Sequence, residues 1–215
     1  MIRVVCVVIG YVFGLFQTGY LYGRMHGIDI REHGSGNAGA TNALRTLGKK
    51  AGVITFLGDA LKCLFASLLV RRLFAGAYPS EANMGVLLGM YASLGAILGH
   101  NFPFYLRFKG GKGIAATGGL LASLDIPLTL LAILIFAGTT ALTRYVSLGS
   151  ILVVLELLIG VIVYGILGKW GLSQPHLYEM YAITAFITIM GIYRHRDNIR
   201  RLLHGTERKI GERAE

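Results

Sequence analysis

The sequence predicts an all-α integral membrane protein. Hydrophobic residues make up 54% of the chain and charged residues only 15%, and the mean hydropathy is +0.60. Soluble domains are typically about a quarter charged and somewhat under half apolar. The apolar residues also gather in long runs, and a helix needs a run of about 20 to cross a bilayer. A soluble protein with a buried core explains one or two such runs, but not most of a chain.

Seven apolar segments follow one another, and we expect each to form a membrane helix. They are residues 2–22, 51–70, 84–106, 114–124, 126–142, 146–167 and 177–193. The first is long and has Arg3 as its only leading charge, so it is typical of a retained span rather than a cleaved signal peptide. The fourth is short for a full span. It meets the fifth at Asp125-Ile126-Pro127, where proline favours a tight turn, so some helices are expected to be short or re-entrant.

The distribution of Lys and Arg predicts the orientation of these helices. If the seven segments alternate and the N-terminus lies outside, only four of these cations lie outside, and Lys62 lies within a span. The four are Arg3, Arg71, Arg72 and Lys169. The others lie inside: Arg24, Arg31, Arg45, Lys49, Lys50, Arg107, Lys109, Lys112, Arg144, Arg194, Arg196, Arg200, Arg201, Arg208, Lys209 and Arg213. Cytoplasmic loops are rich in Lys and Arg, so we expect the C-terminus in the cytoplasm. Residues 1–215 then form a single membrane-embedded domain, with a basic tail that is helical at first.

A segment rich in glycine and small polar residues follows the first span. Its sequence is Gly34-Ser35-Gly36-Asn37-Ala38-Gly39-Ala40-Thr41-Asn42, and Arg45 follows shortly after it. Glycine allows a backbone to approach a ligand closely. The side chains of Ser35, Asn37, Thr41 and Asn42 are able to donate to phosphoryl oxygens, and Arg45 to bind them bidentately. The alternative is an ordinary flexible loop whose Asn, Ser and Gly mark turns.

A second such segment precedes the fourth apolar run. It is Phe108-Lys109-Gly110-Gly111-Lys112-Gly113, and Ile114 is expected to start a helix. Backbone N–H groups at a helix N-terminus, together with two lysines, favour an anion. The spacing is not that of a Walker A loop. The alternative is a basic turn close to the membrane surface.

A third polar cluster follows the last span. His195 and Asn198 are three residues apart, so a helix places them on one face, and Glu207 lies further along the same tail. Basic residues after a final span are usually a positive-inside anchor. That explanation covers most of the arginines of the tail but not His195, Asn198 and Glu207.

Other features exclude several classes of protein. The formal charge of +10 favours an anionic partner, but there is no basic soluble domain for nucleic acid. No HEXXH, CxxC or GxSxG pattern is present, so we expect no metal and no cofactor. Asp59 and Lys62 are three residues apart in the second span, and we expect them to neutralise each other on one helix face. His100 lies near a helix end, where a structural role is favoured.

Together these segments resemble the PlsY family of bacterial acyl-phosphate:glycerol-3-phosphate acyltransferases. The resemblance is carried by residues 34–42 with Arg45, by Gly99-His100-Asn101-Phe102-Pro103 with residues 108–113, and by His195-Arg196-Asp197-Asn198-Ile199 with Gly205-Thr206-Glu207. These motifs occur in order along nearly the whole chain. One departure is Cys63 after Lys62, where the family tends to have glycine, which puts a close helix contact in doubt.

The resemblance implies transfer of an acyl group from acyl phosphate to the 1-hydroxyl of sn-glycerol 3-phosphate, the first acylation of phospholipid synthesis. It implies Ser35, Arg45, His195 and Asn198 as catalytic residues, and Lys109, Gly110, Gly111, Lys112 and Gly113 as substrate-binding residues. Glu207 is implied to be structural. The implied location is the bacterial cytoplasmic (inner) membrane, with the site at the cytoplasmic face. The implied partners are the two substrates, the lipid bilayer and, through a functional link, an enzyme that produces acyl phosphate.

No side chain stands out as a proton acceptor, so we expect a substrate-assisted mechanism in which a phosphate oxygen takes the hydroxyl proton. The main alternative function is a phosphate or organophosphate transporter, which has the same helices and anion loops. Its polar groups are expected to reach the bilayer midplane and the far side, whereas here they gather at one face. A lipid-binding scaffold leaves both glycine segments unexplained.

Overall fold

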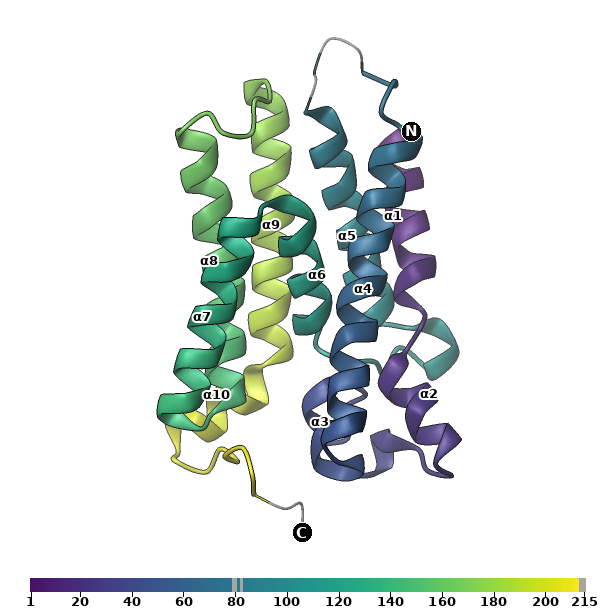
Figure 1. Ribbon diagram of the computed structural model, residues 1–215, viewed down its shortest axis with the longest axis vertical. Helices are drawn as coiled ribbons and strands as arrows, with labels where there is room; N and C mark the ends of the chain where they lie inside the picture. The colour runs from purple at the N-terminus through teal and green to yellow at the C-terminus, as the bar shows by residue number, and fades with distance from the viewer. Residues whose placement is uncertain (79–80, 82, 213–215) are drawn as a thin grey trace.

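A computed structural model describes residues 1–78, 81 and 83–212, and all the regular elements in this part of the chain are helices. The long helices run side by side in a single bundle (Figure 1). The N-terminus lies at one end of the bundle and the last described residues lie at the other. The predicted fold class, an all-α integral membrane protein, is confirmed.

The first predicted segment is two helices rather than one. α1 (Ile2–Gly14) ends near the middle of the chain's first pass, and α2 (Thr18–Met25) begins after a gap of three residues. Side chains bind the carbonyl groups that the break leaves free: Gln17 Nε2 donates to Gly14 O at 3.0 Å and Lys62 Nζ donates to Phe16 O at 2.6 Å. Within a bilayer a helix break is tolerated only when its backbone groups find such partners.

The glycine-rich segment folds differently from the expected loop. A short 3₁₀ turn, η1 (Ile30–Glu32), precedes it, and its last three residues begin α3 (Ala40–Leu47). Thr41, Asn42 and Arg45 are therefore helical residues. Gly48 follows with φ of 88°, a conformation that favours glycine, and α4 (Lys49–Leu73) starts directly after it. α4 extends beyond both ends of the predicted span 51–70.

The third predicted span ends earlier than expected. α5 (Met84–Asn101) stops before Pro103, and η2 (Phe104–Leu106) is a separate 3₁₀ turn. A residue before proline is pushed away from the helical region, which explains the end of α5. The next helix, α6 (Ile114–Leu124), has the predicted bounds. Because α6 is only 11 residues long, the loop before it lies inside the bundle and not at its end (Figure 1).

The last four helices complete the bundle. They are α7 (Ile126–Thr143), α8 (Val146–Ile166), α9 (Gln174–Arg194) and α10 (Arg196–Leu203). α7 begins with a capping bond, in which Asp125 Oδ1 accepts from the N–H of Leu128 at 3.0 Å, and with proline in its first turn. The tail is helical at first, as predicted.

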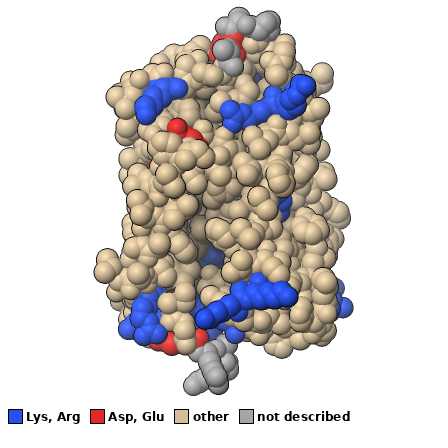
Figure 2. All heavy atoms as spheres, viewed as in Figure 1, with Lys and Arg blue, Asp and Glu red and all other residues tan. Residues whose placement is uncertain are grey.

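Within the described residues, five stretches are long and apolar enough to cross a membrane. They are Ile2–Met25, Lys49–Leu73, Met84–Leu106, Ile126–Thr143 and Val146–Ile166. α9 is as long as α8 but more polar, and α6 is short. The face seen in Figure 2 carries its charged residues mainly near the two ends, with a broad uncharged band between them. That distribution suits a protein whose middle lies in lipid.

α4 and α6 pack closely in spite of the cysteine at position 63. A Cβ placed on Gly119 would lie 2.0 Å from Ala60 O and 3.1 Å from Cys63 Cβ. Cys63 is fully buried. The close contact that Cys63 put in doubt is therefore present, because glycine on α6 provides the space.

Candidate functional site

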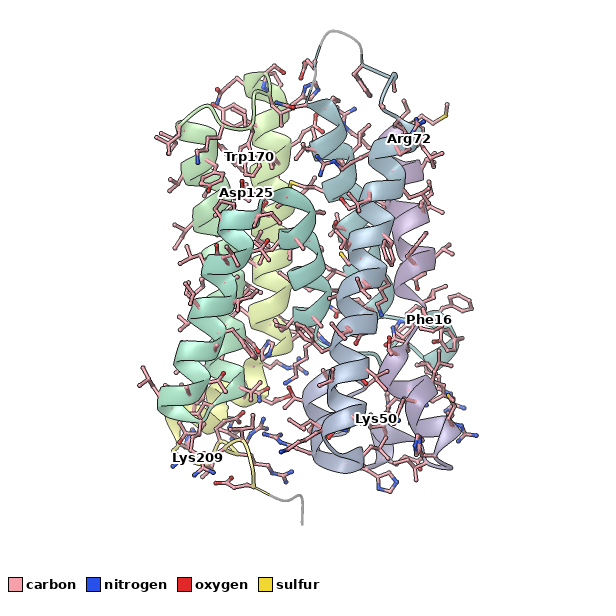
Figure 3. The ribbon with its side chains drawn as sticks, in the orientation of Figure 1. Phe16, Lys50, Arg72, Asp125, Trp170 and Lys209 are labelled. Carbon is pink, nitrogen blue, oxygen red and sulfur yellow. The ribbon has the colours of Figure 1, made fainter. Side chains whose placement is uncertain are left out.

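The three polar segments meet at one place in the bundle. Asn37 Nδ2 of the first segment donates to Gly110 O of the second at 3.4 Å. Lys112 of the second donates to Asn198 Oδ1 of the third. Arg45 Nη2 donates to Arg208 O at 3.3 Å, which joins the first segment to the third. Lys50 and Lys209 mark this end of the molecule in Figure 3.

In the first segment, the structure gives Asn42 a different role from the predicted one. Its Nδ2 lies within 3.0 Å of three carbonyl oxygens, those of Ile30, His33 and Asn37. Its Oδ1 accepts from the N–H of Ser35 at 2.8 Å. The amide is buried and fully occupied by the backbone, so Asn42 shapes the segment and has no free group for a substrate.

The other polar residues of this segment differ in whether their side chains are already hydrogen-bonded to the protein. Asn37 Oδ1 accepts from the N–H of Gly39 at 3.0 Å, so its side chain also serves the backbone. Ser35 is exposed. Thr41 and Arg45 are four residues apart on α3 and therefore share one face. Ser35, Thr41 and Arg45 thus remain candidates for contact with a substrate.

The glycines of the second segment allow close packing and do not free N–H groups. The N–H of Gly110 donates to Asn101 O at 3.2 Å and that of Gly111 to His100 O at 3.0 Å. A Cβ on Gly111 would lie 2.0 Å from His100 Nε2, and one on Gly110 would lie 2.0 Å from His100 O. The N–H groups at the start of α6, after Gly113, have no partner within the helix. Those groups and Lys112 are the donors left for an anion.

Glu207 of the third segment connects α8 with α10. Its Oε1 accepts from Ser147 Oγ at 2.7 Å and from Asn198 Nδ2 at 2.6 Å, and its Oε2 accepts from Arg201 Nε at 2.7 Å. Burial acts to raise the pKa of this carboxyl, but the three hydrogen bonds outweigh it and the pKa is lowered. Glu207 is therefore an ionised, buried anchor, and the same bonds fix the orientation of the Asn198 amide.

His195 lies between α9 and α10 and is buried. Its Nδ1 is 2.8 Å from Gly191 O, and because a carbonyl only accepts, Nδ1 carries the hydrogen. Burial and the nearby Lys112 cation lower the pKa of His195 to about 4. The ring is therefore neutral near pH 7, and the lone pair of Nε2 is available to accept a hydrogen bond.

The cations at the site are partly withdrawn from water. Burial lowers the pKa of Lys112 to about 8. It also lowers the pKa of Arg45, while the Glu207 carboxylate acts in the opposite direction. An arginine stays charged throughout the physiological range, so Arg45 is a permanent cation and Lys112 is one that titrates. Lys109 is exposed.

A cavity of about 570 Å³ lies beside the first two segments. Its lining includes Gly36 and Lys109, together with Arg31, Glu32, Tyr105 and Arg107. His195 and Asn198 are not among its lining residues. The cavity therefore borders the meeting point of the three segments on one side and does not contain all the candidate residues.

Next to the second segment, three buried ionisable side chains form a cluster within the bundle. Lys62 Nζ lies 2.8 Å from Asp59 Oδ1 and 3.0 Å from His100 Nδ1, and Thr18 Oγ1 also donates to Asp59 at 3.2 Å. The predicted pairing of Asp59 with Lys62 is confirmed. His100 has the predicted structural role, because its ring packs directly against Gly111.

Three residues of this region were not singled out in the sequence as site residues. Ser147 and Arg201 bind Glu207, and Arg194 Nη2 donates to the carbonyl oxygens of Gly110 and Gly111 at 3.2 and 2.7 Å. In the sequence, Arg194 and Arg201 are two of many basic residues after the last span. Ser147 is a serine near the start of an apolar helix, and nothing local marks it.

Comparison with known proteins gives one consistent result. The profile of a family described as "Glycerol-3-phosphate acyltransferase" matches residues 4–205. A glycerol-3-phosphate acyltransferase of Clostridioides difficile is 41% identical over 99% of this chain and 97% of its own. One of Alkaliphilus metalliredigens is 40% identical over 100% of this chain and 99% of its own.

The fold is also similar to solved structures. A crystal structure of PlsY, an integral membrane glycerol 3-phosphate acyltransferase, in its glycerol 3-phosphate form matches with a TM-score of 0.83 and 32% identity, over 97% of this chain and 96% of that one. The lysophosphatidic acid form of PlsY matches with a TM-score of 0.80.

Proposed function

Since the chain belongs to the glycerol-3-phosphate acyltransferase family, we propose that it takes its acyl group from acyl phosphate. The acceptor is the 1-hydroxyl of sn-glycerol 3-phosphate, and the products are 1-acyl-sn-glycerol 3-phosphate and inorganic phosphate. The observation that carries this proposal is the meeting of three polar segments through Arg45–Arg208 and Lys112–Asn198. Cations and donors suited to phosphoryl groups are brought together there.

Arg45 and Lys112 bind the phosphate of the acceptor, with Ser35 as a hydroxyl donor and Thr41 on the face of α3 that carries Arg45. Arginine binds phosphate bidentately and lysine acts as a point charge. Asn198 orients Lys112 and is itself oriented by Glu207. This arrangement supports a rigid site, in which the acceptor hydroxyl is positioned relative to the donor.

The donor phosphate is stabilised mainly by fixed charges and dipoles. Acyl phosphate already has a good leaving group, so the negative charge that develops needs donors more than it needs an acid. A well-placed donor supplies on the order of 3 kcal/mol of such stabilisation. The N–H groups at the start of α6 are suited to this task, because a helix N-terminus attracts anions.

The hydroxyl proton passes to an oxygen of a substrate phosphate in the proposed mechanism. The hydroxyl oxygen attacks the carbonyl carbon, the bond from that carbon to the phosphate oxygen breaks, and the departing phosphate carries the proton away. His195 Nε2 accepts a hydrogen bond from the acceptor and orients it. A neutral imidazole held by Gly191 suits such a contact.

We also place the site at the cytoplasmic face of the bacterial inner membrane, with the N-terminus outside. The charge distribution of the sequence supports this orientation. The water-soluble acceptor then comes from the cytosol, and the donor comes from the lipid or from the enzyme that makes it.

The experiment mixes purified protein with acyl phosphate and glycerol 3-phosphate and follows both phosphate and acylated product. We expect equal amounts of the two, and no phosphate without the acceptor. Acyl-CoA and acyl carrier protein are tested as competing donors. Product from either of these but not from acyl phosphate would overturn the donor assignment, and the family would still stand.

A further inference from the structure

Arg194 contacts the backbone of Gly110 and Gly111 and not a carboxylate. Its Nη2 donates to Gly110 O at 3.2 Å and to Gly111 O at 2.7 Å, and its guanidinium lies over the Phe102 ring, 5.4 Å from the centroid. Among residues 1–78, 81 and 83–212, no carboxylate forms an ion pair with it. A cation that served only as a membrane anchor is expected to face water or headgroups, as the exposed Arg196 does.

These two bonds fix the direction of two peptide groups. In a trans peptide the C=O and the following N–H point in opposite directions. The first group has its oxygen, on Gly110, bound to Arg194 and its N–H, on Gly111, bound to His100 O at 3.0 Å. Both ends of that group are therefore held.

The second peptide group is held only at its oxygen. Gly111 O accepts from Arg194, so the N–H of Lys112 must point away from Arg194. In the described part of the chain this N–H has no hydrogen-bond acceptor. It belongs to the same residue as the Lys112 ammonium and lies just before the free N–H groups of α6. The geometry therefore leaves a backbone donor and a cation of one residue at the start of a helix.

We propose that Arg194 is a positioning residue that aims the Lys112 N–H and side chain at a substrate phosphoryl group. The inference rests on the proposed function. Arg194 acts through Gly110 and Gly111 and does not bind the phosphate itself. Because Arg194 directly precedes His195, the same helix end sets both the loop and the imidazole.

Arg196 provides a matched control. It is two residues further on, it is exposed, and its guanidinium lies 4.6 Å from the centroid of the Tyr193 ring. Its Nη1 donates to Tyr193 O at 3.3 Å. It therefore has the same chemistry, a ring contact and a carbonyl contact, but it does not touch the loop.

The first experiment compares Arg194→Gln, Arg194→Lys and Arg196→Gln. The KM for glycerol 3-phosphate and that for acyl phosphate are measured separately, with kcat and with thermal unfolding in detergent. Since a displacement of about 1 Å costs up to 100-fold, we expect Arg194→Gln to raise the KM for glycerol 3-phosphate about tenfold or more. A rise in the KM for acyl phosphate alone would overturn the assignment of Lys112 to the acceptor phosphate. Arg194→Lys is expected to fall in between, and Arg196→Gln to stay within about twofold.

The second experiment combines Arg194→Gln with Lys112→Ala. If Arg194 acts through Lys112, Arg194→Gln raises the KM of Lys112→Ala much less than it raises the KM of wild type, because only the backbone N–H remains to be aimed. Multiplying effects would show that Arg194 acts independently of Lys112 and would overturn the proposal. A KM for both substrates within twofold of wild type in Arg194→Gln and Arg194→Lys would also overturn it. So would an equal rise in both KM values together with a lower unfolding temperature, because that result indicates general damage.

The same proteins separate this inference from the proposed donor. Glycerol 3-phosphate is added without any donor, and the rise in unfolding temperature is measured, since a ligand that binds the native state stabilises it. Wild-type protein that is stabilised but makes no product from acyl phosphate would refute the donor only. Loss of that stabilisation in Arg194→Gln but not in Arg196→Gln then supports the role of Arg194. No stabilisation and no activity in wild type would refute both.

Discussion

Glu207 concentrates three hydrogen bonds on a single carboxylate. Its partners are Ser147 of α8 and Asn198 and Arg201 of α10, so the carboxylate fixes how α8 and α10 meet. None of the local patterns around Glu207 points to Ser147, which is 60 residues away. The structural role implied by the family resemblance now has a physical basis, because removing the acceptor leaves buried donors without partners.

We expect Glu207→Ala to destabilise the protein by about 1–3 kcal/mol for the donors it strands. The measurement is thermal unfolding of the purified protein in detergent. Glu212→Ala is the control, because Glu212 is exposed and accepts only from the N–H of Lys209. Unchanged stability with complete loss of activity in Glu207→Ala would instead indicate that Glu207 contacts the substrate.

The loss of the Lys112 charge is expected to lower activity at alkaline pH. Its pKa is lowered to about 8 by burial, so the side chain is charged below that pH and becomes neutral as the pH rises through it. The attraction for phosphate is lost with the charge. We expect kcat/KM for glycerol 3-phosphate to fall above pH 8, and the fall to move to higher pH in Lys112→Arg, because arginine stays charged. An unchanged alkaline limb in Lys112→Arg would assign it to another group.

His195 is expected to be silent in the pH profile between 6 and 7. With a pKa of about 4, it is neutral across that range in the absence of substrate. The phosphate of the acceptor itself titrates near pH 6, so an inflection there that persists in His195→Ala belongs to the substrate. We expect His195→Ala mainly to raise KM for the acceptor. An inflection that disappears in His195→Ala, with turnover lost and binding unchanged, would make His195 the general base.

At the level of elements, the sequence allowed the prediction of most helices because their apolar runs are long. It did not allow prediction of the break between α1 and α2. The first run is continuous in composition, and the bonds that make the break possible come from distant parts of the chain: Gln17 Nε2 donates to Gly99 O at 3.2 Å and to His100 O at 3.1 Å. α3 was also missed, because glycine and asparagine are typical of loops.

The candidate site shows the same division. Cations and small polar residues were found from composition, and the meeting of the three segments agrees with their expected common side. Which polar group is free and which is occupied was not predictable. The Asn42 amide is saturated by the carbonyl groups of Ile30, His33 and Asn37, two of which lie before its own segment. Arg194 and Arg196 are equivalent in the sequence, although only Arg194 touches the loop.

The close contact between the second segment and the end of α5 is testable with a single methyl group. Gly111→Ala adds a Cβ that would lie only 2.0 Å from His100 Nε2, so the loop must shift. We expect a KM for one or both substrates at least tenfold higher, in line with the cost of a displaced binding group. Gly118→Ala is the control, because nothing lies within 4 Å of the added Cβ. Wild-type kinetics in Gly111→Ala would show that the loop need not hold its position.

At the scale of the whole molecule, the two ends of the bundle differ in what they carry. The half with α3 and α10 holds the three polar segments, the second of them inside the bundle, whereas the other end holds Arg71, Arg72 and Lys169. The N-terminus and the end of the described chain lie at opposite ends (Figure 1). Which end faces the cytoplasm stays a prediction from the charge distribution.

Accessibility labelling tests this orientation. Cys6 and Cys63 are both buried, so the native protein is expected to react little with an impermeant maleimide. Gln174→Cys and Lys50→Cys each add one exposed thiol, at opposite ends of the bundle. We expect the thiol of Gln174→Cys to react from outside intact cells and that of Lys50→Cys to react only after permeabilisation. The reverse pattern would invert the topology.

The length of α6 determines how far into the bundle the loop before it lies. Its 11 residues rise about 16 Å, roughly half of the ~30 Å hydrocarbon layer. In the proposed reaction, the site lies at the cytoplasmic face and the donor chain lies in the bilayer. A helix that stops well short of a full span lets the loop before it reach in from that face, so that the acceptor comes to the donor and the donor chain stays in the lipid. The proposed transfer from a membrane chain to a water-soluble molecule therefore depends on where this one short helix begins.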